Sequence, residues 1–268
     1  PSLLRVTQRL HGRWQRAAQD GRPIELQPEL MRFTVDAIAG LAFGKDINTI
    51  ESDEEVIQQH LEKVFPMLFK RILSYIPWWR LFRTPADREL ERSVVAMNKI
   101  IRGFIGDARQ RLAADPARRT SPPNLLEAMI VPADEDDSGI TDYEVAGNVL
   151  TMLLAGEDTT ANTLAWMIHL MHRNPETLQR AQAEVPRHAP DAAGFTLEQL
   201  AQLRYVDACT HEAMRLKPVA PFQVVEALRD TVVADVRIPQ GTAVWCVMRS
   251  DGVSADYFDQ PDTFDPER

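Results

Sequence analysis

Residues 153–163 read Leu-Leu-Ala-Gly-Glu-Asp-Thr-Thr-Ala-Asn-Thr, in the middle of a stretch whose pattern otherwise suits a helix. Glycine costs about 1 kcal/mol relative to alanine inside a helix, and threonine is a poor helix former, so another force overrides local propensity here. A flat partner pressing on the backbone at Ala155 and Gly156 is one reason, with the Thr159 hydroxyl turned into the carbonyl ladder or toward a bound molecule. Asp158 adjoins Thr159, so an acid and a hydroxyl meet as a proton relay requires. The alternative is that Gly156 lets a crossing helix approach.

The helix around this stretch is long. Thr141 and Glu144 form a capping box at its start, and nothing requires it to end before Pro175. At about 1.5 Å per residue it spans roughly 50 Å, which makes it the central helix of the fold. Apolar residues recurring at intervals of three and four predict further helices over 3–19, 28–43, 54–76, 85–114, 124–130, 175–185 and 197–216, the last with a break near Arg204.

Beyond Pro221 the pattern becomes alternating. Short apolar runs at 231–233, 236–238 and 243–247, with the turn Pro239-Gln240-Gly241 before the last, predict a β-hairpin. Helices followed by a small sheet indicate a mainly α (α+β) fold.

Composition excludes several classes of protein. The 268 residues carry 30 Lys and Arg against 39 Asp and Glu, a net charge of −9, which disfavours nucleic acid as a partner. Two cysteines exclude a disulfide framework and favour the cytoplasm. No apolar run approaches the roughly 18 to 20 residues that cross a bilayer. We expect residues 1–268 to be one partial domain, because both ends read as the interior of a longer protein.

A second pattern follows the central helix. Glu212 and Arg215 lie three residues apart on one helix face, next to Ala213, Met214 and Leu216. An exposed pair of this kind contributes only about 0.2 to 0.5 kcal/mol. A buried pair needs a further partner, and the acid-rich tail that ends at Arg268 is a candidate source.

Four motifs in the same order resemble the cytochromes P-450, the haem-thiolate monooxygenases. Residues 155–160 match the family's motif of a small residue, Gly, any residue, an acid, Thr, and then Thr or Ser. Residues 212–221 match its Glu-x-x-Arg followed by Leu-x-Pro-x-x-Pro. Ile-Pro-x-Gly-Thr follows at 238–242, and Phe-x-Pro-Glu-Arg at 264–268. The resemblance implies a monooxygenase that inserts one atom of dioxygen into an organic, apolar substrate.

The resemblance also implies roles for particular residues. Haem lies against Ala155 and Gly156, while Thr159 with Asp158 holds the water that delivers protons. A buried structural network joins Glu212, Arg215 and Arg268. The expected substrate contacts are Met152, Val219, Ala220 and Phe222.

The family's iron-ligating cysteine loop would lie beyond Arg268, so the resemblance assigns no metal ligand to this chain. Cys209 and Cys246 lack the required loop and are expected to be small apolar fillers. The implied partners are a small organic substrate, dioxygen and a redox partner, either a ferredoxin or a flavin reductase. We expect the fragment alone to be inactive.

Two other functions remain open at this stage. One is a non-catalytic helical interaction module, in which the charged pairs are only salt bridges. The other is a magnesium-dependent isoprenoid synthase, with Asp134, Glu135, Asp136 and Asp137 as the metal-binding acids. Because Pro and Gly flank that acidic run, a solvated loop is the favoured interpretation.

Overall fold

The structure is a computed structural model that describes residues 2–52, 56–72, 74, 76, 78–134, 139–191 and 194–268. By its internal contacts the chain divides into two compact units, Pro1–Ala161 and Asn162–Arg268, and the boundary falls inside one long helix. The expectation of a single partial domain stays a prediction. Within the described residues, no helix combines the length and apolar character needed to cross a bilayer.

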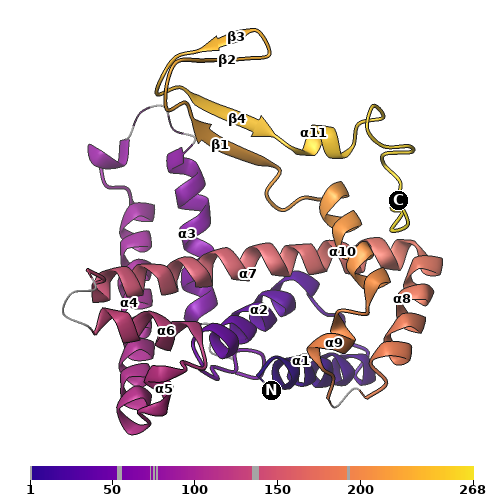
Figure 1. The fold of residues 1–268 in the computed structure, drawn as a ribbon, viewed down its shortest axis with the longest axis horizontal. Helices are drawn as coiled ribbons and strands as arrows, with labels where there is room; N and C mark the ends of the chain where they lie inside the picture. Colours follow the sequence, from indigo (N-terminus) through magenta and orange to yellow (C-terminus); the bar gives the residue numbers. More distant parts are fainter. Residues whose placement is uncertain are drawn as a thin grey trace. The chain divides into compact units, whose positions relative to one another are not determined.

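The first unit is helical (Figure 1). Its elements are α1 (Ser2–Gln19), α2 (Leu26–Ala42), α3 (Val56–Ile72), the 3₁₀ turn η1 (Trp78–Arg80), α4 (Pro85–Ala114), α5 (Ala117–Thr120), α6 (Leu125–Ala133) and the larger part of α7 (Asp142–Arg173). Thr84 begins α4 with a complete capping box, and Thr141 exchanges the same bonds with Glu144 at the start of α7. Both starts follow from the sequence, since a hydroxyl followed three residues later by an acid satisfies two free backbone N–H groups.

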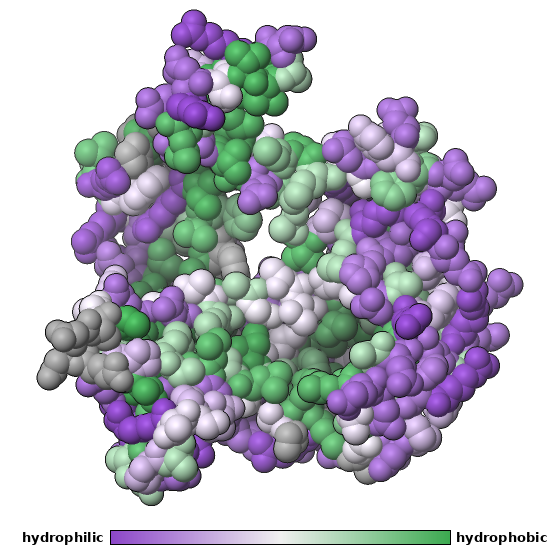
Figure 2. All heavy atoms as spheres, viewed as in Figure 1, coloured by the Kyte–Doolittle hydropathy of each residue, from purple (hydrophilic) through white to green (hydrophobic). Residues whose placement is uncertain are grey.

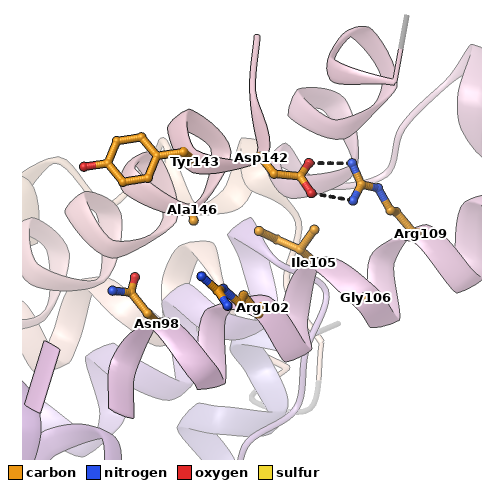
Figure 3. A pocket seen from close by; sticks show the side chains of 8 residues that line it. All are labelled: Asn98, Arg102, Ile105, Gly106, Arg109, Asp142, Tyr143 and Ala146. Carbon is orange, nitrogen blue, oxygen red and sulfur yellow. Dashed lines mark hydrogen bonds and ion pairs between the residues drawn. The ribbon is translucent and has the colours of Figure 1, made fainter. Parts of the chain in front are cut away.

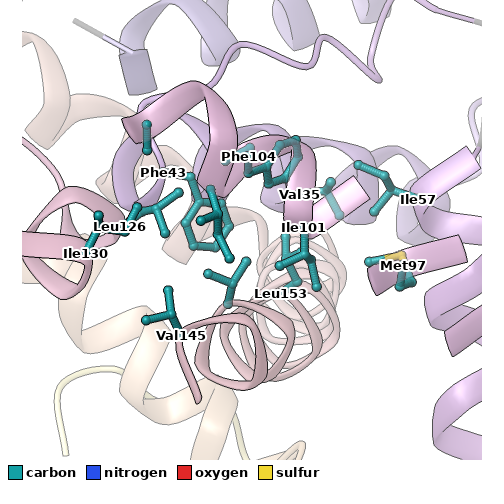
Figure 4. Close-up of a cluster of buried hydrophobic side chains, with 14 of the residues drawn as sticks. Val35, Phe43, Ile57, Met97, Ile101, Phe104, Leu126, Ile130, Val145 and Leu153 are labelled. Atoms are coloured by element: carbon teal, nitrogen blue, oxygen red, sulfur yellow. The ribbon is translucent and has the colours of Figure 1, made fainter. Parts of the chain in front are cut away.

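One buried apolar cluster holds this unit together. Figure 4 shows side chains from α2, α4, α6 and α7 meeting in it, with Phe43 and Phe104 at a ring-centroid distance of 6.0 Å. The α7 contribution comes from Val145, Val149 and Leu153, spaced four residues apart on one face. On the opposite face of this part of α7, Thr151, Ala155 and Thr159 are exposed.

The second unit combines helices with two small sheets. Its elements are the remainder of α7, then α8 (Pro175–His188), α9 (Leu197–Leu200), α10 (Arg204–Leu216), β1 (Phe222–Glu226), β2 (Thr231–Val233), β3 (Val236–Ile238), β4 (Ala243–Val247) and α11 (Arg249–Gly252). Met171, Cys209, Ala213, Leu216 and Phe264 belong to its buried core. The predicted mainly helical α+β class is confirmed, and so is the break before Arg204.

The predicted hairpin pairing is wrong. Strand β3 pairs with β2 through a turn at Ala234 and Asp235, both at positive φ (46° and 65°), whereas β4 pairs with β1, a strand the sequence analysis missed. A two-residue turn with both residues at positive φ suits the twist of a hairpin and normally uses Asn or Gly, so Ala-Asp gave little signal. Val232, Val233 and Val236 of these two strands are exposed, and Figure 2 shows hydrophobic side chains at the top of the view, where Figure 1 places β2 and β3.

Two smaller expectations also change. Pro132 lies inside α6, which continues to Ala133 beyond the predicted end at 130, and a short helix, α5, lies between the predicted helices 85–114 and 124–130. Residues 54, 55, 73 and 75 of the predicted helix 54–76 lie outside the described residues, and α3 ends at Ile72.

Candidate functional site

The exposed face of α7 carries small residues. Ala155 and Thr159 are exposed, whereas Leu153, Glu157 and Ala161 are buried in the same turns of the helix. The Thr159 hydroxyl donates to the carbonyl oxygen of Ala155 at 2.6 Å. It is turned into the carbonyl ladder, which is one of the two orientations that the sequence allows.

Gly156 faces α2 rather than the exposed face of α7. A Cβ atom built on Gly156 would clash with Cδ1 of Ile38 on α2 and lie 3.3 Å from its Cγ1. The absence of a side chain at Gly156 thus lets α2 approach α7, as the alternative interpretation of this glycine proposes. The predicted contact of Gly156 with haem stays a prediction.

A second contact between α2 and α7 was not foreseen. The Thr34 hydroxyl is hydrogen-bonded at 3.0 Å to the backbone oxygen of Glu157 and at 2.9 Å to that of Met31. Both Thr34 and the Glu157 side chain are buried. The sequence signal is a threonine among the apolar residues of 30–42, but sequence alone does not say which helix it meets.

Two further predicted residues of α7 are partly buried. Met152 packs against the apolar cluster of the first unit, and Asp158 lies between the exposed and the buried face of the helix. Their roles in substrate contact and proton delivery stay predictions.

The remaining predicted substrate residues lie in the second unit, after α10. Val219 is partly buried and Ala220 exposed in the bend that leads to β1, and Phe222 opens that strand. The Phe222 ring lies 4.9 Å, centroid to centroid, from Trp245 on β4. Because these residues and Met152 belong to different units, their place in one pocket stays a prediction.

The structure brings Glu212, Arg215 and Arg268 together. Nε and one terminal nitrogen of Arg215 each donate to Glu212 at 2.7 Å, and Nε of Arg268 donates to Glu212 Oε1 at 3.1 Å. The backbone N–H of Asp265 donates to the same oxygen at 3.0 Å. Burial raises the pKa of Glu212, but the bonds from Arg215, Asp265 and Arg268 outweigh it, and the net pKa is lowered.

The two arginines use their other donors on backbone carbonyl oxygens. Arg215 reaches those of Gly252, Pro261 and Thr263, and Arg268 reaches those of Asp259, Gln260 and Thr263. Buried guanidinium groups need this many acceptors, because an unsatisfied buried donor is costly. The network thus ties α10 to residues 252–268.

The two cysteines differ in environment. Cys209 is fully buried in α10, where burial and the charge of Glu184 raise its pKa to about 11. Cys246 is exposed on β4. A thiol with such a pKa stays protonated at neutral pH, so Cys209 is a poor metal ligand.

The acidic run of the isoprenoid-synthase hypothesis is described only at Asp134. Its carboxylate accepts hydrogen bonds from Arg109 and Arg119, each at 2.9 Å. Glu135, Asp136 and Asp137 lie outside the described residues. Asp134 is therefore already neutralised by two arginines.

Comparison with known proteins identifies the family. A family model for Cytochrome P450 matches residues 1–268. Cytochrome P450 97B2, chloroplastic, from Glycine max is 28% identical over 93% of this chain and 46% of that protein, and Steroid 21-hydroxylase from Sus scrofa is 28% identical over 94% and 52%. The crystal structure of the cytochrome P450DA heme domain superposes with a TM-score of 0.82 at 26% identity, covering 100% of this chain and 56% of that one. The chain spans about half the length of these curated relatives, and it belongs to the cytochrome P450 family.

Proposed function

We propose that the protein containing this chain is a haem-dependent monooxygenase that inserts one atom of dioxygen into an apolar organic substrate. Family membership supports the reaction class, and relatives are named Steroid 21-hydroxylase and Carotene epsilon-monooxygenase. Family membership favours this reaction over the two alternatives, a non-catalytic interaction module and an isoprenoid synthase. The observation that carries the proposal is the exposed Ala155–Thr159 face of α7.

The residues of this face suit a flat cofactor. Ala155 ends at Cβ, and the Thr159 hydroxyl is held close to the helix by its bond to the Ala155 carbonyl, so nothing bulky projects at these two positions. Ala155 is the side-chain contact that we assign to haem, whereas Gly156, whose Cβ direction is filled by Ile38, contributes backbone only. When bound, haem supplies the reductive activation of dioxygen.

Thr159 has a directional role in this proposal. A hydroxyl carries one proton, and that of Thr159 goes to the Ala155 carbonyl, so toward a bound molecule Thr159 offers an accepting oxygen. A water molecule that donates to Thr159 is thereby oriented in the site. We assign delivery of the next proton to the neighbouring carboxyl group of Asp158.

The substrate assignment rests on side-chain chemistry. Met152, Val219, Ala220 and Phe222 are apolar, which suits an apolar substrate. Electrons are assigned to a separate redox partner, a ferredoxin or a flavin reductase, although a relative from Oidiodendron maius is named a self-sufficient monooxygenase. The cytoplasmic location stays a prediction, because relatives from Glycine max and Arabidopsis thaliana are named chloroplastic.

The test compares two threonines of α7 in the full-length, haem-loaded protein. Thr159→Ala should lower the product formed per reduced cofactor oxidised by about tenfold and raise peroxide correspondingly, because the water that donates to Thr159 is no longer oriented for proton delivery. Thr159→Ser should restore most of the coupling. Thr151→Ala is the matched control, because Thr151 is also exposed on α7 and bonds the carbonyl four residues back at 2.8 Å.

Unchanged coupling in Thr159→Ala would remove this residue from proton delivery. An equal loss in Thr151→Ala would assign the effect to helix stability instead.

A further inference from the structure

A cavity of about 460 Å³ lies between α4 and the first turns of α7. In Figure 3, Asn98 and Arg102 rise from α4 on the side that faces Tyr143 and Ala146 of α7. Ala146 is nine residues from Ala155, which is roughly 13 Å along a helix. The cavity is therefore separate from the oxygen site proposed above, and the inference does not depend on that function.

The charges of the cavity leave one cation available. Asp142 is neutralised by Arg109, whose terminal nitrogens donate to its two oxygens at 2.8 and 2.6 Å. Arg109 also bonds Asp134. For Arg102, by contrast, no hydrogen bond or ion pair connects its guanidinium with any part of the chain that the structure describes.

At the start of α7 the capping residues Thr141 and Glu144 already bond each other. Glu144 accepts hydrogen bonds from the backbone N–H and the hydroxyl of Thr141 at 2.7 and 2.9 Å, and the Thr141 hydroxyl is bonded to the Glu144 N–H at 3.3 Å. Among the described residues that line the cavity, the polar side chains that remain are those of Arg102, Asn98 and Tyr143, and Arg102 is the one that carries a charge.

A glycine on α4 borders the cavity. Gly106 lines the cavity, and a Cβ atom built on it would meet nothing within 4 Å. Glycine inside a helix costs about 1 kcal/mol relative to alanine, and no neighbour requires it here. Ile105 and Ala146 give the same cavity an apolar wall.

We propose that this cavity binds a small organic monoanion, a carboxylate with a short apolar chain. The carboxylate pairs with the guanidinium of Arg102 and accepts from the Asn98 amide, and the chain lies on Ile105 and Ala146. Guanidinium groups bind carboxylates through two parallel hydrogen bonds. The volume falls in the range of roughly 300–1,000 Å³ that is typical of small-molecule sites.

The test is calorimetric titration of the full-length, haem-loaded protein with hexanoate. Acetate, which has the charge without the chain, and 1-hexanol, which has the chain without the charge, should each bind at least tenfold more weakly. Arg102→Gln should raise the Kd for hexanoate at least tenfold. Lys99→Gln is the matched control, because it removes one positive charge from the neighbouring position of α4 outside the cavity lining.

Gly106→Leu gives an independent measurement, since it fills the cavity and replaces a poor helix former with a good one. It should abolish hexanoate binding while leaving Tm unchanged or higher. An unchanged Kd in Arg102→Gln would overturn the proposal, because hexanoate would then bind elsewhere. If Lys99→Gln weakened hexanoate binding equally, the effect would be one of general charge, and the proposal would fall. If 1-hexanol bound with equal affinity, the site would be an uncharged apolar one, which would overturn the proposal too.

Discussion

Each unit contains one buried carboxylate held by two arginines, and the two arrangements support different kinds of structure. Glu127 is 0% exposed and bonded by Arg111 and Arg118, whose side chains are 29% and 28% exposed. Glu212 is 6% exposed and bonded by Arg215 and Arg268, which are 10% and 16% exposed. The first network keeps contact with water, and the second is nearly closed to it.

The surroundings explain why the difference matters. Glu127 joins α4, α5 and α6, which include side chains of the large apolar cluster such as Leu112, Leu126 and Ile130. Glu212 joins α10 to residues 253–268, which form no helix or strand and bury one large apolar side chain, Phe264. In the second unit the ion network therefore takes over part of the ordering that apolar packing supplies in the first.

The largest expected effect is that of Glu212→Ala. Removing one partner of a buried ion pair leaves its charge uncompensated and costs about 3 to 5 kcal/mol. We expect little soluble, haem-loaded full-length protein, and fast hydrogen exchange over 253–268 in what is recovered. Asp207→Ala is the control, because Asp207 is an exposed carboxylate on the same helix. Normal yield and Tm for Glu212→Ala would show that the network does not order this segment.

A second test uses the pH dependence of Glu127. Burial raises its pKa, but hydrogen bonds from Arg118, Asn124 and Arg111 outweigh this and lower it from 4.5 to about 2. A lowered pKa contributes stability above pH 4.5 that is lost as pH falls toward 2, at most about 3 kcal/mol here.

Glu127→Gln cannot titrate and should lack this contribution. Urea unfolding at pH 6, 4 and 3 should show a wild-type advantage that is nearly full at pH 6 and shrinks as the pH falls below 4.5. A constant difference would mean that the pKa of Glu127 is not lowered by folding.

The smallest expected effect is a local change in the accessibility of the Cys209 thiol. Cys209 belongs to the same buried core as Phe264, so its labelling rate reports on that core. Maleimide labelling of Cys209, followed by peptide mass spectrometry, should be slow in the wild type because the thiol is buried with a pKa of about 11. Glu212→Ala should accelerate labelling at least tenfold, and Glu127→Gln should not. Equal acceleration in both variants would break the comparison, because the two regions would then open together.

Much of the fold and part of the Glu212 network could be predicted from local sequence patterns. The capping box at Thr141 and the break before Arg204 each depend on residues only a few positions apart. The local sequence is therefore enough to predict them. The Glu212–Arg215 pair follows from the i, i+3 spacing. The acid-rich tail that ends at Arg268 was a candidate partner for this pair, but only the family resemblance assigned Arg268 itself to the network, because nothing local joins it to α10.

The features that were missed depend on distant partners. Arg111 lies 16 residues from Glu127 and Arg118 lies nine away, so no helical spacing indicates that they meet. Asn124, three residues before Glu127, accepts from the Glu127 N–H as an N-cap, but a cap indicates only where a helix starts. The pairing of β1 with β4 likewise joins strands that the whole β2–β3 hairpin separates in the sequence. The turn of that hairpin, Ala234 and Asp235, is itself unusual in composition, so it gave little signal either.

The contact between Gly156 and Ile38 has a consequence for the evolution of this protein. Two positions far apart in the sequence share one small volume, so a larger residue at position 156 makes the Ile38 side chain shift or favours a smaller residue at position 38. Homologues with alanine at the position of Gly156 should carry valine or alanine at that of Ile38. Such pairwise covariation would mark the α2–α7 crossing in an alignment without any structure.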